Sequence, residues 1–172
     1  MSCDISLGRI EQCKDSIGGL AAVYFVNFGD ASSYTIVDEV ITAVLGTPQA
    51  FKYELKGTST FTQTLTSSRE NGTTFVDQIV SLSLKKLSSA DNKQIKLLAF
   101  GRPQIIIEDN NGNRFLAGLT KGVDLTSAVI STGAAMGDSS GYQIEMQGME
   151  PIAANFITGD LTTIGFTIVL GT

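Results

Sequence analysis

Carboxylates are the leading candidates for acid–base chemistry in this chain, because none of its 172 residues is a histidine. Without an imidazole base, the usual serine and cysteine triads cannot be assembled. Two pairs of adjacent acids are present, Asp38 with Glu39 and Glu108 with Asp109. Adjacent residues of a strand point to opposite faces, so neither pair can share a substrate. We therefore predict no catalytic residue and no enzyme activity.

Three oxygen-bearing side chains at alternate positions, Asp109, Asn111 and Asn113, suggest a calcium-binding loop. However, the glycine falls at the fourth position of that loop instead of the sixth, and Thr120 stands in place of the closing glutamate. An Asn-Gly step between two apolar runs is instead a strong hairpin signal. We predict a hairpin over residues 104–119 and no metal site.

Glycines recur at Gly133, Gly137 and Gly141, a spacing that suggests a phosphate-binding loop. No lysine follows the last glycine, so we predict a flexible connection between strands and no cofactor. Cys3 and Cys13 are the only cysteines. A disulfide framework or a zinc site needs more ligands than these, and we predict free thiols.

The composition indicates one soluble domain spanning residues 1–172. A hydrophobic content of 42% is enough for one substantial core at this length. The formal charge of −5 argues against a surface that binds nucleic acid through its phosphates. No basic leader and no run of roughly 18 apolar residues is present, so we expect a protein made in the cytoplasm with no membrane partner.

Threonine occupies every second position in one segment, which predicts a β-strand with an uncharged hydroxyl face. These threonines are Thr58, Thr60, Thr62, Thr64 and Thr66. The preceding residues 51–56 alternate as well and turn at Gly57, so we predict that the two strands form a hairpin.

Further strands are predicted at 22–27, 36–45, 74–86, 104–109, 114–119, 122–132, 142–148 and 164–170. The run 36–45 also tolerates a helix. The run 74–86 would be about 40 Å long, so it must bend across two sheets or project beyond its domain. A helix is predicted over residues 89–100, with an N-cap in the preceding serines. The predicted fold is therefore mainly β, a sandwich or barrel with one flanking helix.

The last predicted strand is apolar on both faces. One face carries Ile164, Phe166, Ile168 and Leu170. Such a tail needs a partner surface in its own domain or in a neighbouring copy. We predict a β arm over residues 158–172 for contact between subunits, and expect deletion of Asp160 to Thr172 to weaken assembly but leave a folded, soluble monomer.

The order of these elements resembles the tail-tube proteins of tailed bacteriophages. The resemblance extends over about two thirds of the chain. It is carried by FKYELKGTSTFTQTLTSSRENGTTFVDQIVSLSLKK (51–86), the helix near 89–100 and GYQIEMQGMEPIAANFI (141–157), with similarity to structural proteins of phages that infect Bacteroidetes-type hosts. The strand expected after Pro151 departs from the simplest tube protein.

This resemblance implies a virion structural protein that is assembled in the host cytoplasm. Such proteins form homohexameric rings that stack into a tube, whose inner wall is a barrel of strands from all six subunits and whose lumen conducts DNA during ejection without binding it specifically. The threonine strand or the strand after it would then line the bore. The loop at Ala31 to Ser33 and the C-terminal strand would contact stacked rings, neighbours or a sheath.

Two other interpretations stay open. The chain could be another virion ring component, such as a connector, a tail-completion protein or a capsid-decorating protein. From a different class, it could be a carbohydrate-binding β-sandwich, although the absence of tryptophan leaves few aromatic platforms for a sugar.

Overall fold

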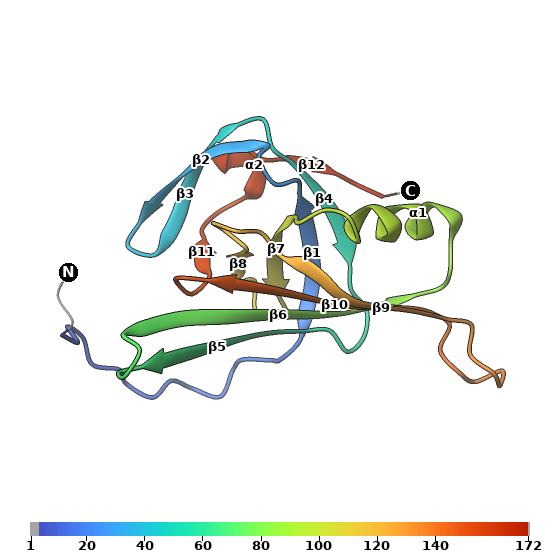
Figure 1. Ribbon diagram of the computed structural model, residues 1–172, viewed down its shortest axis with the longest axis horizontal. Helices are drawn as coiled ribbons and strands as arrows, with labels where there is room; N and C mark the ends of the chain where they lie inside the picture. The colour runs from blue at the N-terminus through green and yellow to red at the C-terminus, as the bar shows by residue number, and fades with distance from the viewer. Residues whose placement is uncertain (1–3, 172) are drawn as a thin grey trace.

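The computed structural model describes residues 4–171 and consists of two β-sheets with two short helices (Figure 1). It confirms the prediction of a mainly β fold with a flanking helix. The elements are β1 (Leu20–Val26), β2 (Ala31–Val37), β3 (Val40–Gly46), β4 (Gln49–Glu54), β5 (Thr60–Ser68), β6 (Thr73–Lys85), α1 (Ser89–Leu98), β7 (Gln104–Asp109), β8 (Arg114–Ala117), β9 (Asp124–Ser131), β10 (Gly141–Glu150), β11 (Asn155–Ile157), α2 (Leu161–Ile164) and β12 (Thr167–Val169).

The smaller sheet has four antiparallel strands in the order β5-β6-β10-β9. β6 pairs with β10 from Val76 to Lys85, whereas Thr73 to Phe75 pair only with β5. The end of the β5–β6 hairpin therefore extends past the rest of the sheet, on the left of Figure 1. The long strand β6 therefore projects beyond its sheet and does not bend across both sheets.

The larger sheet has eight strands in the order β12-β4-β1-β7-β8-β11-β3-β2. Its central strands β1 and β7 are buried on both faces, which explains their unbroken apolar runs. Val23 and Phe25 of β1 face a core shared with the four-stranded sheet and α1. Tyr24 and Val26 face a second core on the other side. Strands of the larger sheet and α2 together form this second core, so the larger sheet curls around it, while the four-stranded sheet and α1 cover the other face of β1 and β7.

Helix α1 begins where the serines predicted it. The Ser88 hydroxyl oxygen accepts a hydrogen bond from the Asp91 backbone N–H at 3.1 Å, which caps the first turn. The Tyr142 hydroxyl donates to the Ser88 carbonyl at 3.0 Å and so ties this end of the helix to β10. Ile95 is the only fully buried side chain of the helix, so α1 flanks the core without dividing it.

The strand predicted over residues 36–45 is wrong, because the chain reverses direction in its middle. Asp38 and Glu39 form a two-residue turn with φ of 50° and 66°, the left-handed pair required by a type I′ hairpin. Strands β2 and β3 pair on either side of this turn. Asp-Glu lacks the usual Asn-Gly signal, so the turn escaped sequence analysis. The loop expected at Ala31 to Ser33 is instead the start of β2.

The hairpin predicted between residues 51–56 and the threonine strand is also wrong. β4 pairs with β1 and β12 in the larger sheet, while β5 pairs with β6 in the smaller one. The connection passes from one sheet to the other through Leu55, whose side chain is buried in the core that the two sheets share. Gly57 turns the chain between layers and not between paired strands.

The C-terminal residues do not form the single strand expected from 164 to 170. Leu161 to Ile164 form α2, and only Thr167 to Val169 form a strand, parallel to β4. Ile164 and Phe166 are 8% and 3% exposed within the second core, while Ile168 packs against it. Only Leu170 of the four predicted arm residues is well exposed. The arm predicted over 158–172 therefore packs largely against its own chain.

The glycine series in the β9–β10 loop reflects turn geometry. A Cβ on Gly141 would lie 2.0 Å from the Leu84 carbonyl oxygen, because β10 begins against the end of β6. Gly133 has a φ of 73° and lies against Asp138. Gly137 has no atom within 4 Å of a Cβ position. The lack of space for a Cβ atom thus explains Gly133 and Gly141 but not Gly137.

We expect Gly141→Ala to destabilise the protein by about 2–4 kcal/mol, because the backbone of β6 or β10 must shift to relieve the clash. Gly137→Ala in the same loop is the matched control, with an expected change within about 0.5 kcal/mol. Urea unfolding followed by circular dichroism measures both. Equal stabilities of the two variants would contradict this packing.

Candidate functional site

The outward side of the four-stranded sheet gathers small polar side chains from all four strands. Thr60 pairs with Ser81, Ser81 with Glu145, and Glu145 with Ser127. Residues directly opposite one another in antiparallel strands point to the same face, so these four side chains form one row across the sheet. Parallel rows on either side extend the pattern along the strands.

We call this surface the hydroxyl face. It consists of Thr60, Thr62, Thr64, Asp77, Ile79, Ser81, Ser83, Asp124, Ser127, Val129, Gln143, Glu145 and Gln147. Its charged members Asp77, Asp124 and Glu145 are acids, and one base, Lys85, follows on the same side at the end of β6. Its opposite side carries core residues such as Val80 and Met146, both 0% exposed.

The hydroxyl face is a shallow polar surface. A shallow depression of about 340 Å³ lies near its centre, lined mainly by serine, threonine and glutamine side chains with Glu145. The Gln147 amide donates to the Asp77 carboxylate at 2.7 Å, so part of the face is held by its own hydrogen bonds. Hydroxyl and amide groups of this kind donate and accept hydrogen bonds to water.

All five predicted threonines are exposed. Thr60, Thr62 and Thr64 belong to the hydroxyl face, whereas Thr58 precedes β5 and borders the depression. Thr66 pairs with Phe75 in the projecting part of the hairpin, beyond the reach of β10. The predicted series is therefore on one side of the molecule but extends past the site.

The contributions of β9 and β10 to this face could not be predicted from the sequence. The alternation of Gln143, Glu145 and Gln147 with apolar residues was visible, as was that of Ser81 and Ser83 on β6. Each pattern assigns side chains to one face of its own strand. Only the order of strands in the sheet brings them together.

Both edges of this sheet are open among the residues that the structure describes. β5 forms one edge and carries no charged residue, and β9 forms the other with Asp124 as its only charge. Val129 and Ile130 of β9 are each 52% exposed. Long edge strands without lysine or proline are ready to pair with another strand.

The two acid pairs have structural partners. Glu108 forms an ion pair with Arg114 at 2.9 Å and accepts a hydrogen bond from the Tyr24 hydroxyl. Burial, then the Glu108 charge, raises the pKa of Tyr24. Glu39 accepts a hydrogen bond from the Asn155 side chain at 3.0 Å. These contacts join strands to one another. The two acids of each pair do not face a common cleft.

The residues that suggested a calcium loop bind one another. One Asp109 carboxylate oxygen accepts from the backbone N–H groups of Asn111 and Asn113, and the other accepts from the Asn113 side chain. Burial raises the pKa of Asp109, but these hydrogen bonds outweigh burial and hold it below its usual value. The turn between β7 and β8, predicted from the Asn-Gly step, is confirmed.

Because the folded pKa of Asp109 lies below its unfolded value, its carboxylate stabilises the fold above about pH 4 and loses this effect as pH falls further. We expect Asp109→Ala to cost about 1 kcal/mol at pH 7, allowing for solvent screening, and much less near pH 3. Chemical unfolding at both pH values measures this. Glu70→Ala, at the exposed tip of the β5–β6 hairpin, is the control. A cost for Asp109→Ala that is independent of pH would contradict the proposed role of the carboxylate.

Within residues 4–171, no three His, Cys, Asp or Glu side chains gather as a metal site would require. Neither helix in this part of the chain is long and apolar enough to cross a bilayer. Cys13 is an exposed free thiol, and Cys3 lies outside the described residues.

Comparison with protein-family models, curated proteins and solved structures gave no significant match in any of the three.

Proposed function

We propose that this protein is a structural subunit of a phage tail tube, which forms stacked homohexameric rings whose lumen conducts DNA. The observation that carries the proposal is a four-stranded sheet with two open edges and a polar outer face, whose one base, Lys85, lies at the end of β6. A ring of such sheets, joined edge to edge, gives a closed barrel with one uniform inner surface.

The number of strands favours a closed ring. Neighbouring strands alternate in direction from β5 to β9, so an even count makes the two edge strands antiparallel to each other. When copies are related by rotation about an axis along the strands, β9 of one copy meets β5 of the next in an antiparallel sense. The alternation then continues around the barrel, and every edge is paired.

The hydroxyl face is proposed to line the bore. DNA must pass through without adhering, and adhesion arises mainly when Lys and Arg neutralise phosphates and release counterions. Asp77, Asp124 and Glu145 repel phosphates instead, while the threonines and serines hold water on the wall. On this side of the sheet, the one aromatic side chain that could stack on bases or sugars is Phe75, in the part of the hairpin that extends past β10.

Features at opposite ends of the sheet are suited to contact between stacked rings. The β5–β6 turn projects at one end, and the β9–β10 loop projects at the other (Figure 1). Arg69 and Glu70 are exposed in the turn, and Met136 is fully exposed in the loop. In a tube of rings with one polarity, each turn would face the loop of the next ring. Leu170, Arg102 and the outer surface remain for a sheath or other tail proteins.

Negative-stain electron microscopy of the purified protein, with its mass in solution, tests the proposal. Hollow tubes or stacked six-fold rings are expected. A single finite ring would instead favour a connector, and a monomer that persists beside other tail components would favour a decorating protein.

A variant of the open edge sharpens this test. Ile130→Lys places a charge on the exposed edge strand β9, which should prevent ring closure and leave a folded monomer. Thr163→Lys, an exposed position on α2, adds the same charge away from the edges and should assemble normally. Normal rings from Ile130→Lys would exclude β9 from the joint between subunits.

A further inference from the structure

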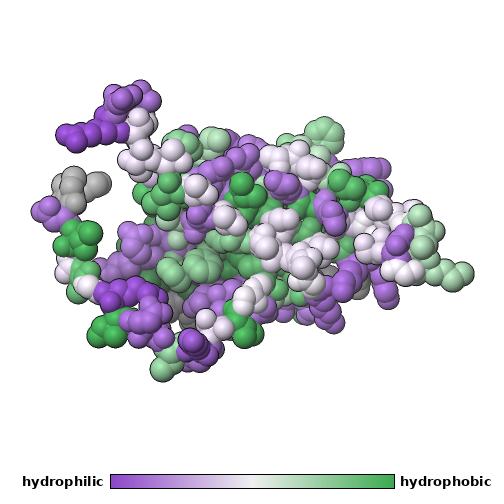
Figure 2. Space-filling model, turned by 90° about the horizontal axis from the view of Figure 1, so that it is seen from below, coloured by the Kyte–Doolittle hydropathy of each residue, from purple (hydrophilic) through white to green (hydrophobic). Residues whose placement is uncertain are grey.

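The N-terminal segment is an extended arm with uncovered apolar side chains. Residues 4–17 contain neither helix nor strand. Ile5, Leu7 and Ile10 are 94%, 86% and 88% exposed, so three large apolar side chains of one short segment are open to solvent together. Figure 2 shows hydrophobic residues beside the grey N-terminus, standing clear of the body at its left. Among residues 4–171, no side chain covers this hydrophobic surface.

The base of the arm is fixed. Asn111 accepts a hydrogen bond from the Ile17 N–H at 2.9 Å, and its amide donates to the Ile17 carbonyl at 2.7 Å. The Asn110 amide donates to the Gly18 carbonyl at 2.8 Å. These bonds to the β7–β8 turn make the arm leave the body at a defined point.

An apolar groove lies beside α1, near the far end of β1 from the arm. Its volume is about 800 Å³. Arg102 and Asp124 are its charged members. Aromatic and leucine side chains line most of it, namely Phe25, Phe28, Phe51, Tyr53, Leu97, Leu98 and Phe100. Phe100 is 92% and Leu97 56% exposed, so the mouth of the groove is also apolar.

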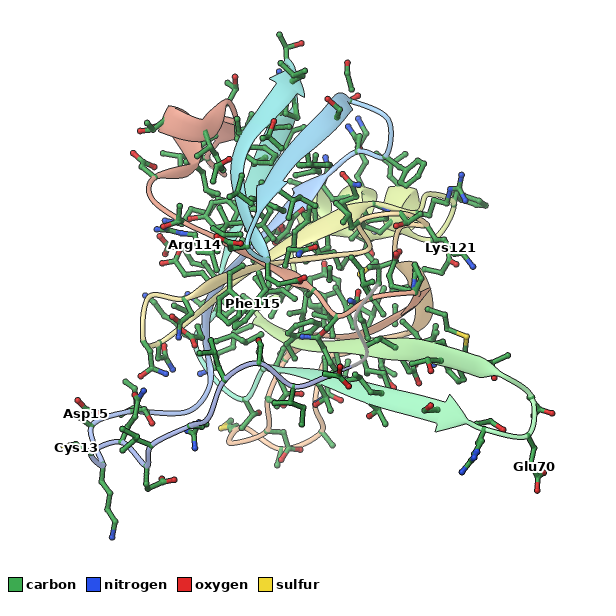
Figure 3. The ribbon with its side chains drawn as sticks, turned by 90° about the vertical axis from the view of Figure 1, so that its left-hand side faces the viewer. Cys13, Asp15, Glu70, Arg114, Phe115 and Lys121 are labelled. Carbon is green, nitrogen blue, oxygen red and sulfur yellow. The ribbon has the colours of Figure 1, made fainter. Side chains whose placement is uncertain are left out.

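The arm points away from the groove of its own chain. In Figure 1 the arm runs to the lower left while α1 is at the upper right, and in Figure 3 Cys13 and Asp15 lie at the lower left, on the side away from α1. From its anchor at Ile17, an extended arm spans about 40 Å to Ile5, enough to reach an adjoining molecule. Each molecule therefore carries one uncovered apolar segment and one uncovered apolar groove, on opposite sides.

We propose that residues 5–10 of one copy lie in the α1 groove of a second copy. In an extended chain Ile5 and Leu7 project to the same side and can enter the groove together. One arm and one groove per copy give a head-to-tail contact that continues from subunit to subunit. The inference rests on the proposed function only in requiring that copies of the chain meet.

Disulfide cross-linking between two distinguishable chains tests this contact. Both chains carry Cys3→Ser and Cys13→Ser; one adds Leu7→Cys on the arm, and the other, made larger by a tag, adds Gln94→Cys in the groove. Under mild oxidation we expect a hybrid band of summed size on a non-reducing gel. Asp15→Cys, near the anchored base of the arm, replaces Leu7→Cys in the control and should give at most a trace of hybrid.

A second pair of variants tests the energetics without new thiols. Leu7→Asp should raise the protein concentration needed for half-maximal association about tenfold, because it removes one buried leucine from each contact. Ser6→Asp adds the same charge to the adjacent exposed position and should change that concentration less than twofold. Sedimentation measures both, and circular dichroism verifies that both variants remain folded.

The outcomes separate this inference from the proposed function. If rings form without the hybrid band, the arm contact is contradicted, whereas the proposed tube function is not. A hybrid band without rings or tubes would support the arm contact and count against the tube. Equal hybrid yields from Leu7→Cys and Asp15→Cys would overturn the contact between copies.

Discussion

Deletion of Asp160–Thr172 is expected to unfold the protein. Leu161, Ile164 and Phe166 are 1%, 8% and 3% exposed and belong to the core enclosed by β1, β3 and α2. Truncation of one such side chain to alanine costs about 2–5 kcal/mol, so the loss of all three approaches or exceeds the whole stability of a typical domain. The deletion also removes the pairing of β12 with β4.

Circular dichroism and thermal unfolding of the truncated protein measure this effect. Removal of residues 170–172 alone is the control, because Leu170 is 69% exposed and its loss should leave the fold intact. Phe166→Ala isolates one contribution, with an expected cost of about 3–5 kcal/mol. If the variant that lacks Asp160–Thr172 still unfolds cooperatively like the full-length protein, the segment is a dispensable arm, as predicted from the sequence.

Simultaneous replacement of Thr60, Thr62 and Thr64 by lysine is expected to make the protein bind DNA. The three side chains are exposed, so the fold should persist. Three cations would then offset the three acids of the hydroxyl face, Asp77, Asp124 and Glu145. If each lysine contacts a phosphate, the logarithm of affinity should fall with the logarithm of salt concentration with a slope of about −2 to −3.

Glutamine at the same three positions is the matched control, since it adds length without charge. Fluorescence titration of labelled duplex DNA at several salt concentrations distinguishes the two variants. In a phage that uses this protein, the lysine variant should assemble but lose infectivity, while the glutamine variant retains it. Equal infectivity of the two would place the hydroxyl face outside the bore.

Local patterns predicted several elements well. Alternation of polar and apolar residues gave β5, β6 and β10, because side chains of a strand alternate between two environments. The Ser88 cap gave the start of α1, and the Asn-Gly step gave the β7–β8 turn. In each case, residues close in sequence contain the whole signal.

Contacts between segments distant in sequence were harder to predict. The turn at Asp38 and Glu39 lacks the residues that usually favour positive φ, so one predicted strand concealed a hairpin. Gly57 between two alternating segments indicated a hairpin, but their pairing energies favoured different partners in different sheets. The side chains of Asn110 and Asn111 bind the base of the N-terminal arm across 92 and 94 positions of sequence. No pattern of neighbouring residues predicts such a contact.

The sequence by itself determined that this protein is built mainly of strands, that one strand carries a row of threonines, and that histidine-based catalysis is unavailable. Only the tertiary structure decided which strands are neighbours, and so joined Thr60, Ser81, Glu145 and Ser127 into one surface. It also decided that Ile164 and Phe166 are buried in their own chain. The physical reason is that periodicity fixes the face on which a side chain lies, whereas its cover depends on free energies of packing between segments distant in sequence.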